Sequence, residues 1–303
     1  MEGKTVKRLI ALFLICCAAL SLSPAGAGEI TDTLARIKQD GQVIVGHRES
    51  SVPFSYYDAN QNVVGYSQEY SSLIVEALKK ELNLPDLKVK YVPITSQNRI
   101  PLLQNGTYDF ECGSTTNNLE RQKQVAFSNT LFIIGTRILV HKDSGIKDFP
   151  DLRGKVLAVT SGTTSERLAF KMKDETKLDM EIISLTDHGD SFRAVESGRA
   201  DAFFIDDALL AGERARARTP ADFEIVGTPQ SYEAYGAMLR KDDPKFKAFV
   251  DKVIADIQKS GKALGLFKKW FQNPIPPRGM NMNFDLPEAM KDLFANPNDK
   301  AFQ

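Results

Sequence analysis

The chain has 303 residues, a hydrophobic content of 42%, and 39 basic and 39 acidic side chains that give a formal net charge of zero. This length suits two ordinary domains, each large enough to bury a core. Because the net charge is zero, there is no global field that would favour nucleic acid or an anionic membrane, and we expect neither as a partner.

Residues 1–27 have the layout of a secretory signal peptide. Basic residues lie at positions 4–8, and an apolar run follows at 9–23. The small-x-small pattern of a cleavage site lies at 25–27. The apolar run is too short for a comfortable membrane span. We therefore expect cleavage and export to the periplasm of a Gram-negative bacterium, with no membrane insertion of the mature chain. A lipoprotein is the alternative, because Cys16 and Cys17 lie here, although Ile15 stands where a small residue would be expected.

Cys112 is the only cysteine that remains once this segment is removed. The exported chain can therefore form no intramolecular disulfide, and its stability must come from its core. A lone cysteine among strand residues is typical of a small buried hydrophobic side chain and not of a catalytic thiol.

Helices and strands alternate in the first part of the mature chain, as the spacing of apolar residues indicates. In chain order, the expected elements are a helix at 30–38, strands at 42–46, 87–94 and 108–112, and helices at 68–82 and 97–103. A loop with aromatic cover is predicted at 53–57, and an extended apolar segment at 132–140. The connections have the length that right-handed parallel crossovers require.

A second α/β unit repeats this order. Its expected strands lie at 156–159, 180–185 and 200–205, with helices after the loops 160–166 and 186–190. Short strands at 222–226 and 234–239 follow, and then helices at 243–257, 261–271 and 288–294.

Polar side chains follow the three predicted strands of the first unit. They are Arg48, then Ser96 and Arg99, then Ser114, Thr116 and Arg121. Ligands of open α/β sheets bind beyond the carboxyl ends of the strands, so the three guanidiniums point to one rim. The stretch 112–121 also combines hydroxyls and an arginine at a strand-to-helix junction, which suits a carboxylate. Taken alone, it is more typical of a capped turn with a solvated arginine.

Signals for other chemistry are weak. The hydroxyl-rich loop 160–166 lacks a phosphate-binding glycine pattern, and either caps a helix or receives a carboxylate. His188 follows a strand end, where it could donate to an anion or cap a helix at the surface. The three histidines show no metal-binding spacing, and no nucleophile elbow is present. We expect no catalytic residue, no metal and no cofactor.

Taken together, the motifs resemble those of periplasmic amino-acid-binding proteins of ABC importers, solute-binding protein family 3, and most of all the glutamate/aspartate-binding branch. The resemblance is carried by residues 46–55, 94–101, 112–128, 161–164, 187–189 and 198–206. It implies the two-lobed α/β fold of type II binding proteins, in which two open mixed sheets are joined by two hinge strands and the ligand lies between the lobes. The implied lobes are 28–137 with 233–303, and 138–232, with hinge strands at 136–140 and 235–239.

The resemblance also implies ligand contacts. Arg121 would clamp the α-carboxylate with help from Ser114 and Thr116. From the second lobe, Thr163 or Thr164 would reach over the ligand, and Asp206 would pair with the α-ammonium. Arg48 and Arg99 would contribute further contacts and add positive charge. Ser96 would also contact the ligand, at a position that is aromatic in several relatives. His188 would add a last contact and a fraction of a positive charge.

The charges of these side chains favour an acidic ligand. A neutral amino acid would leave Arg48 and Arg99 buried without partners, which costs several kcal/mol and would reject glutamine about a hundredfold or more. The implied partners are glutamate or aspartate, which the sequence does not distinguish, and an inner-membrane ABC permease that recognises a closed, monomeric binding protein. The alternatives are a dehydratase-like enzyme of the same fold, with Glu49 or Glu111 as general acid, and a ligand-sensing binding protein.

Overall fold

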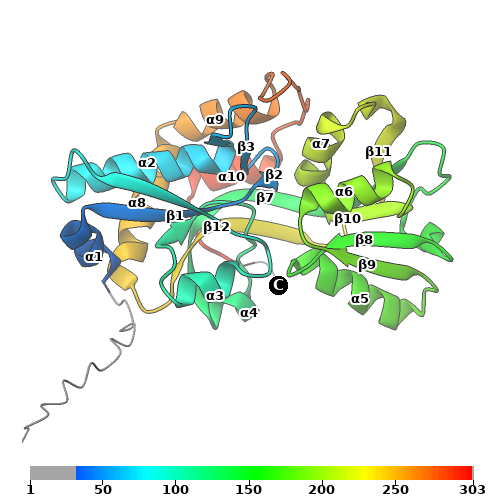
Figure 1. Ribbon diagram of the computed structural model, residues 1–303, viewed down its shortest axis with the longest axis horizontal. Coiled ribbons are helices and arrows are strands. Elements are labelled where there is room, and N and C mark those ends of the chain that lie inside the picture. Colours follow the sequence, from blue (N-terminus) through cyan, green and yellow to red (C-terminus); the bar gives the residue numbers. More distant parts are fainter. Residues whose placement is uncertain (1–31, 302–303) are drawn as a thin grey trace, which may run out of the picture.

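The structure, a computed structural model, describes residues 32–301 (Figure 1). The predicted signal peptide and the start of the predicted helix at 30–38 lie outside these residues. The helices are α1 Thr33–Asp40, α2 Tyr66–Glu81, α3 Arg99–Gln104, α4 Leu119–Gln122, α5 Thr164–Thr176, α6 His188–Glu196, α7 Asp207–Arg216, α8 Pro244–Lys259, α9 Lys262–Phe271 and α10 Glu288–Ala295. No helix within 32–301 is long and apolar enough to cross a membrane.

The strands form two groups, visible on the left and right of Figure 1. Their bounds are β1 Gln42–His47, β2 Ser50–Ser51, β3 Ser55–Tyr57, β4 Val63–Val64, β5 Lys88–Pro93, β6 Phe110–Glu111, β7 Val125–His141, β8 Val156–Thr160, β9 Glu181–Leu185, β10 Ala202–Asp206, β11 Phe223–Val226 and β12 Tyr232–Arg240. The main sheet has the order β5-β1-β6-β12-β7-β10-β8-β9, with β11 on β7. The predicted parallel crossovers are confirmed, because β1 pairs in parallel with β5 and β6, and β8 with β9 and β10.

The strand β7 passes from one group to the other. Up to Gly135 it pairs with β12, and from Thr136 onward it pairs with β10. Beside this change of partner, Thr136 N–H donates to the Ser231 carbonyl at 3.1 Å, and Gln230 N–H donates back to Thr136 at 3.1 Å. The two segments of the chain that pass between the strand groups are therefore hydrogen-bonded to each other. The expected hinge segments 136–140 and 235–239 lie inside the sheets on either side of this point, and the lobe boundaries stay a prediction.

Several local features differ from expectation, among them the helices α4 and α7, which are absent from the expected elements. Residues 55–57, predicted as loop, form the middle strand of a small antiparallel sheet, β2-β3-β4, whose strands are too short to show a period. The helix predicted from residue 97 begins at Arg99, because Thr95 and Asn98 exchange side-chain hydrogen bonds of 2.8 and 3.2 Å that hold a turn before it. The extended segment predicted from 132 begins at Val125.

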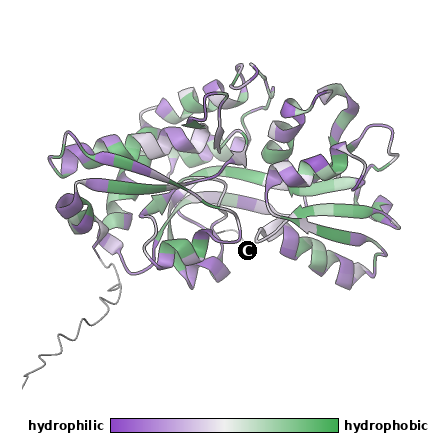
Figure 2. Cartoon of the chain, in the orientation of Figure 1, coloured by the Kyte–Doolittle hydropathy of each residue, from purple (hydrophilic) through white to green (hydrophobic). Residues whose placement is uncertain are grey.

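Hydrophobic residues are concentrated on the strands, whereas hydrophobic and hydrophilic residues alternate along the helices (Figure 2). In the first unit, Phe54, Phe132, Phe271 and Tyr235 form an aromatic cluster with ring centroids 4.9 to 6.4 Å apart. Cys112 is fully buried, as predicted, and burial raises the pKa of its thiol. This core holds β1 and β6, whose carboxyl ends carry the polar side chains considered next.

Candidate functional site

The three predicted arginines are buried together. Exposed fractions are 0% for Arg48, which follows β1, 2% for Arg99, which begins α3, and 3% for Arg121 in α4. Burial, and then the field of Arg48, lowers the pKa of Arg99 to about 10. Burial, and then the field of Arg99, holds the pKa of Arg121 well below its usual value. The predicted convergence at one rim is therefore confirmed.

Each guanidinium contacts other protein groups, but some N–H donors of Arg48 and Arg99 have no hydrogen-bond partner in the described residues. Arg99 Nη1 donates to Thr115 Oγ1 at 2.8 Å, and Arg121 donates to the carbonyls of Thr116 at 3.0 Å and Gly162 at 3.2 Å. Arg48 Nη2 lies 3.5 Å from Asp187 Oδ2. Within residues 32–301, Nε and Nη1 of Arg48 and Nε of Arg99 are buried without a hydrogen-bond partner.

Other predicted residues also carry buried polar atoms that find no partner in the described part of the chain. These atoms are Ser96 Oγ, Ser114 Oγ, His188 Nε2 and Asp206 Oδ1. Such atoms are uncommon in folded proteins, and each calls for an explanation. Here they combine cationic and hydroxyl donors with one carboxylate acceptor, which are the groups that recognise an amino acid with an extra carboxylate.

His188 is buried in a setting that disfavours a charged imidazole. It is 1% exposed, and its Nδ1 lies 3.0 Å from Thr160 Oγ1. Burial, together with the fields of Arg48 and Arg99, lowers its pKa well below the usual value. This shift opposes the expected fraction of a positive charge, which stays a prediction for the ligand-bound site.

Asp206 ends β10 and is 4% exposed. It accepts a hydrogen bond from the hydroxyl of Tyr235 on β12. Burial, and then the field of Glu233, raises its pKa well above the usual value, while Arg121 acts in the opposite direction. A cation placed at Oδ1 would favour the ionised form, so this carboxyl group is suited to pair with an ammonium group.

The hydroxyls of Thr163 and Thr164 are engaged within the protein. Thr163 is the N-cap of α5, where its Oγ1 donates to the Thr160 carbonyl at 2.7 Å and accepts from Glu166 N at 3.0 Å. Thr164 Oγ1 donates to Glu233 Oε2 at 3.1 Å. Thr116 is 4% exposed and forms an isolated bridge with Tyr235. Ligand contacts of these threonines stay a prediction.

The second unit lies directly over the first at this site. Arg121 bonds the Gly162 carbonyl, Ser50 Oγ donates to Asp187, and Gly189 N–H donates to Ser50 Oγ at 3.3 Å. Gly162 has a φ of +79°, and a Cβ there would lie 2.6 Å from Gln97 Cα. The two units therefore meet through close backbone contact that only a glycine allows.

Replacing Gly162 by alanine is expected to weaken ligand binding by about five- to a hundredfold, since overpacking costs roughly 1–3 kcal/mol. The clash with Gln97 arises only when the two units are in contact, so it opposes the closed arrangement. Gly198→Ala is the matched control, because Gly198 has a φ of +74° but nothing within 4 Å of its Cβ position. Equal affinity losses in the two variants, measured by calorimetry, would show that backbone strain alone is responsible.

Several residues of the site were not singled out as ligand contacts by sequence reasoning. Glu111 and Thr115 lie beside Arg99, Asp187 contacts Arg48 and Ser50, and Tyr235 contacts Asp206. Glu111 is a carboxylate inside the predicted strand 108–112, and this placement was the one sign in the sequence that linked it to the site. The other contacts join distant parts of the chain and left no local pattern.

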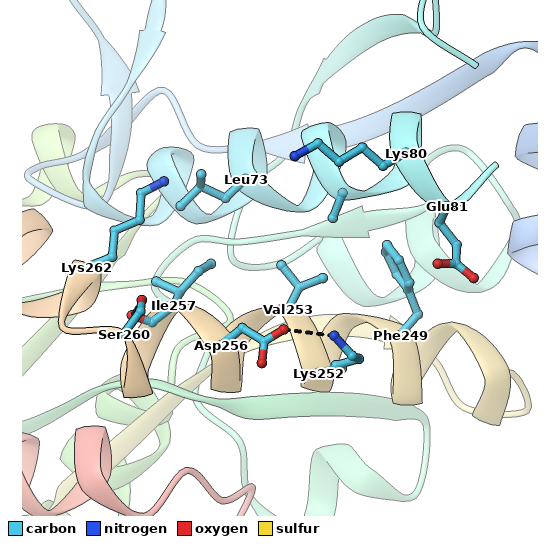
Figure 3. Close-up of a pocket in the computed structure, with 11 residues that line it drawn as sticks. Leu73, Lys80, Glu81, Phe249, Lys252, Val253, Asp256, Ile257, Ser260 and Lys262 are labelled. Atoms are coloured by element: carbon cyan, nitrogen blue, oxygen red, sulfur yellow. Dashed lines mark hydrogen bonds and ion pairs between the residues drawn. The ribbon is translucent and has the colours of Figure 1, made fainter. Parts of the chain in front are cut away.

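A separate groove of about 620 Å³ lies between α2 and α8 (Figure 3). Leu73, Phe249 and Val253 line its apolar part, and Lys252 pairs with Asp256 at 2.9 Å on its rim. It contains none of the predicted site residues. Within 32–301, no cluster of three His, Cys, Asp or Glu side chains could hold a metal ion.

Comparison with known proteins gives three findings. A family model described as bacterial extracellular solute-binding proteins, family 3, matches residues 43–273. The glutamate/aspartate import solute-binding protein of Salmonella typhimurium is 65% identical, and the L-glutamate/L-aspartate-binding protein of Pseudomonas aeruginosa is 55% identical, each over 94% of both chains. An ancestral arginine-binding protein, solved with arginine bound, is 31% identical with a TM-score of 0.68, over 76% of this chain and 98% of that chain.

Proposed function

Because the chain belongs to the bacterial extracellular solute-binding proteins of family 3, we propose that it captures glutamate or aspartate and delivers it to an ABC permease. Its fold is the two-lobed α/β fold of type II amino-acid-binding proteins. The relatives reported above are named as binding or import proteins, so transport is favoured over catalysis.

One observation carries the choice of ligand. Donors of Arg48 and Arg99 and the Oδ1 of Asp206 are buried without partners in 32–301, and the fields of both Arg99 and Asp206 act on Arg121. A neutral α-amino acid could satisfy Asp206 but would leave the extra guanidinium donors unpaired, at a cost of several kcal/mol. A second carboxylate on the ligand would satisfy them, which favours an acidic amino acid.

The proposed contacts divide the ligand into two parts. Arg121, Ser114 and Thr116 hold the α-carboxylate, and Asp206 holds the α-ammonium. The side-chain carboxylate is held by the set Arg48, Ser96, Arg99 and His188. His188 contributes hydrogen bonding from a neutral ring. Thr163 and Thr164 cover the ligand from the second lobe at the start of α5.

The proposal also covers the export of the chain and its permease partner. The signal peptide at residues 1–27 lies outside the described residues, and we propose that its cleavage releases a monomer into the periplasm. The lobes 28–137 with 233–303, and 138–232, would close on the ligand and present the closed form to the permease. Scattering should record a smaller radius of gyration when glutamate is added to stripped protein. An unchanged radius would contradict closure.

The direct test is a thermal-shift screen of the twenty amino acids. The protein is first unfolded and refolded to remove bound ligand. Glutamate and aspartate are expected to raise the melting temperature, because ligand at a hundred times its Kd adds about 2.7 kcal/mol of stability. Glutamine should give a much smaller shift at the same concentration. Equal shifts in melting temperature for glutamine and glutamate, or no shift with either acidic ligand, would contradict the proposal.

A further inference from the structure

Glu111 is a fully buried carboxylate outside the proposed set of ligand contacts. It lies on β6, which pairs with β1 at Gly46 and with β12 at Met238. These two strands lead to Arg48 and carry Tyr235, the partner of Asp206. Glu111 therefore comes from the strand between the elements that build the site.

A single hydroxyl links Glu111 to the arginine cluster. Arg99 Nη1 donates to Thr115 Oγ1 at 2.8 Å, and Thr115 Oγ1 donates to Glu111 Oε1. The guanidinium can only donate, and the hydroxyl has one proton, so Glu111 Oε1 must be the acceptor at the end of this chain. This direction of donation suits an ionised carboxylate.

Two glycines leave room for the Glu111 side chain. A Cβ on Gly113 would lie 2.7 Å from Glu111 Oε2 and 3.6 Å from Arg48 Cγ. A Cβ on Gly46 would lie 3.2 Å from Glu111 Cβ. The carboxylate is therefore fixed beside Arg48 by close packing, and its Oε2 has no hydrogen-bond partner within 32–301.

The fields around Glu111 come from the proposed ligand-binding arginines. The pKa of Glu111 is raised, because burial outweighs the fields of Arg99, Arg48 and Arg121 and the hydrogen bond from Thr115, which all act to lower it. Glu111 in turn supports the charged form of Arg99, against the effect of burial. The carboxylate and a bound anionic ligand would thus share the same three guanidiniums.

We propose that Glu111 is a specificity-determining residue that acts without touching the ligand. Its carboxylate is the internal counter-charge of the arginine cluster. It offsets part of the positive charge of the three buried guanidiniums, as do Asp206 and the buried Glu233, whose fields act on Arg121. Asp187, another carboxylate near Arg48, has 18% of its side chain exposed and is partly screened by water. This inference rests on the proposed function.

The test is Glu111→Gln, in which the amide oxygen can still accept from Thr115 while the charge is removed. We expect the ratio of the glutamine Kd to the glutamate Kd to rise at least about fivefold, because an unopposed guanidinium attracts the side-chain carboxylate more strongly. 4-Carboxyglutamate, with one more negative charge, should gain affinity relative to glutamate. The ligand-free protein should melt at a lower temperature.

Asp109→Asn is the matched control. Asp109 is also buried and lies directly before β6, but it pairs with Arg36 and Arg240 instead of the ligand-binding arginines. This variant should lower the melting temperature and leave the Kd ratio unchanged. Glu111→Asp, which keeps the charge, should retain a ratio close to that of the wild type.

Thr115→Val gives a second route if Glu111→Gln does not fold. Loss of the hydroxyl removes the hydrogen bond that favours the ionised carboxylate, so the Kd ratio should rise in the same direction, by about twofold. If the wild type does not bind glutamate, the proposed function fails. If it binds glutamate but neither variant raises the ratio, or both ligands weaken equally, the role of Glu111 is overturned and the proposed function stands.

Discussion

Replacing Arg121 by alanine is expected to weaken the binding of glutamate, aspartate and every other α-amino acid by at least about thirtyfold. The guanidinium is 3% exposed and already donates to the carbonyls of Thr116 and Gly162, which fixes its plane. Truncating one partner of a buried charge pair costs roughly 2–5 kcal/mol, or about thirtyfold to several-thousandfold in Kd. The loss should be the same for acidic and neutral ligands, because all of them share the α-carboxylate.

Calorimetry on Arg121→Ala, Arg121→Lys and Arg167→Ala would check this expectation. Lysine keeps the charge but cannot reproduce the planar pair of donors, so its affinity should fall between those of the other two variants. Arg167 is an exposed residue of α5 whose field reaches Arg121, and its loss should change affinity little. If the Kd of Arg121→Ala lies within about tenfold of the wild-type value, Arg121 does not bind the α-carboxylate as proposed.

The convergence of Arg48, Arg99 and Arg121 was predictable from the sequence because a general rule of sheet geometry applies. Each arginine follows a strand of a parallel α/β unit, and the carboxyl ends of such strands share one edge. The apolar periods gave most helices and strands to within a few residues. The small sheet that contains Ser55–Tyr57 was missed because strands of two or three residues carry no period.

The electrostatics of the site could not be predicted in the same way. Whether His188 is charged depends on burial and on two arginines from other elements, and neither is written in its neighbouring residues. The contact between Ser50 and Asp187 joins residues 137 positions apart, and the bond from Thr164 to Glu233 joins residues 69 apart. Such contacts depend on how the second unit meets the first. They decide which hydroxyls and carboxylates remain available to a ligand.

Arg48 offers the sharpest test of specificity, since its role is expected to differ from that of Arg121. It is fully buried, and Nε and Nη1 find no partner in the described residues. A neutral ligand should leave these donors unpaired, whereas a side-chain carboxylate should satisfy them. The preference for glutamate over glutamine should therefore depend on this one cation more than affinity for amino acids in general does.

Replacing Arg48 by alanine is accordingly expected to reduce the glutamate preference from about a hundredfold to about tenfold or less, while glutamine keeps most of its affinity. Arg99 remains, so some preference should survive. Arg193→Ala is the control, because Arg193 is an exposed arginine of α6 that pairs with Asp190. Calorimetric titration of both ligands would separate the outcomes. A selective loss for glutamate supports a side-chain contact, whereas equal losses would mean that Arg48 acts mainly through Asp187, by holding the two lobes together.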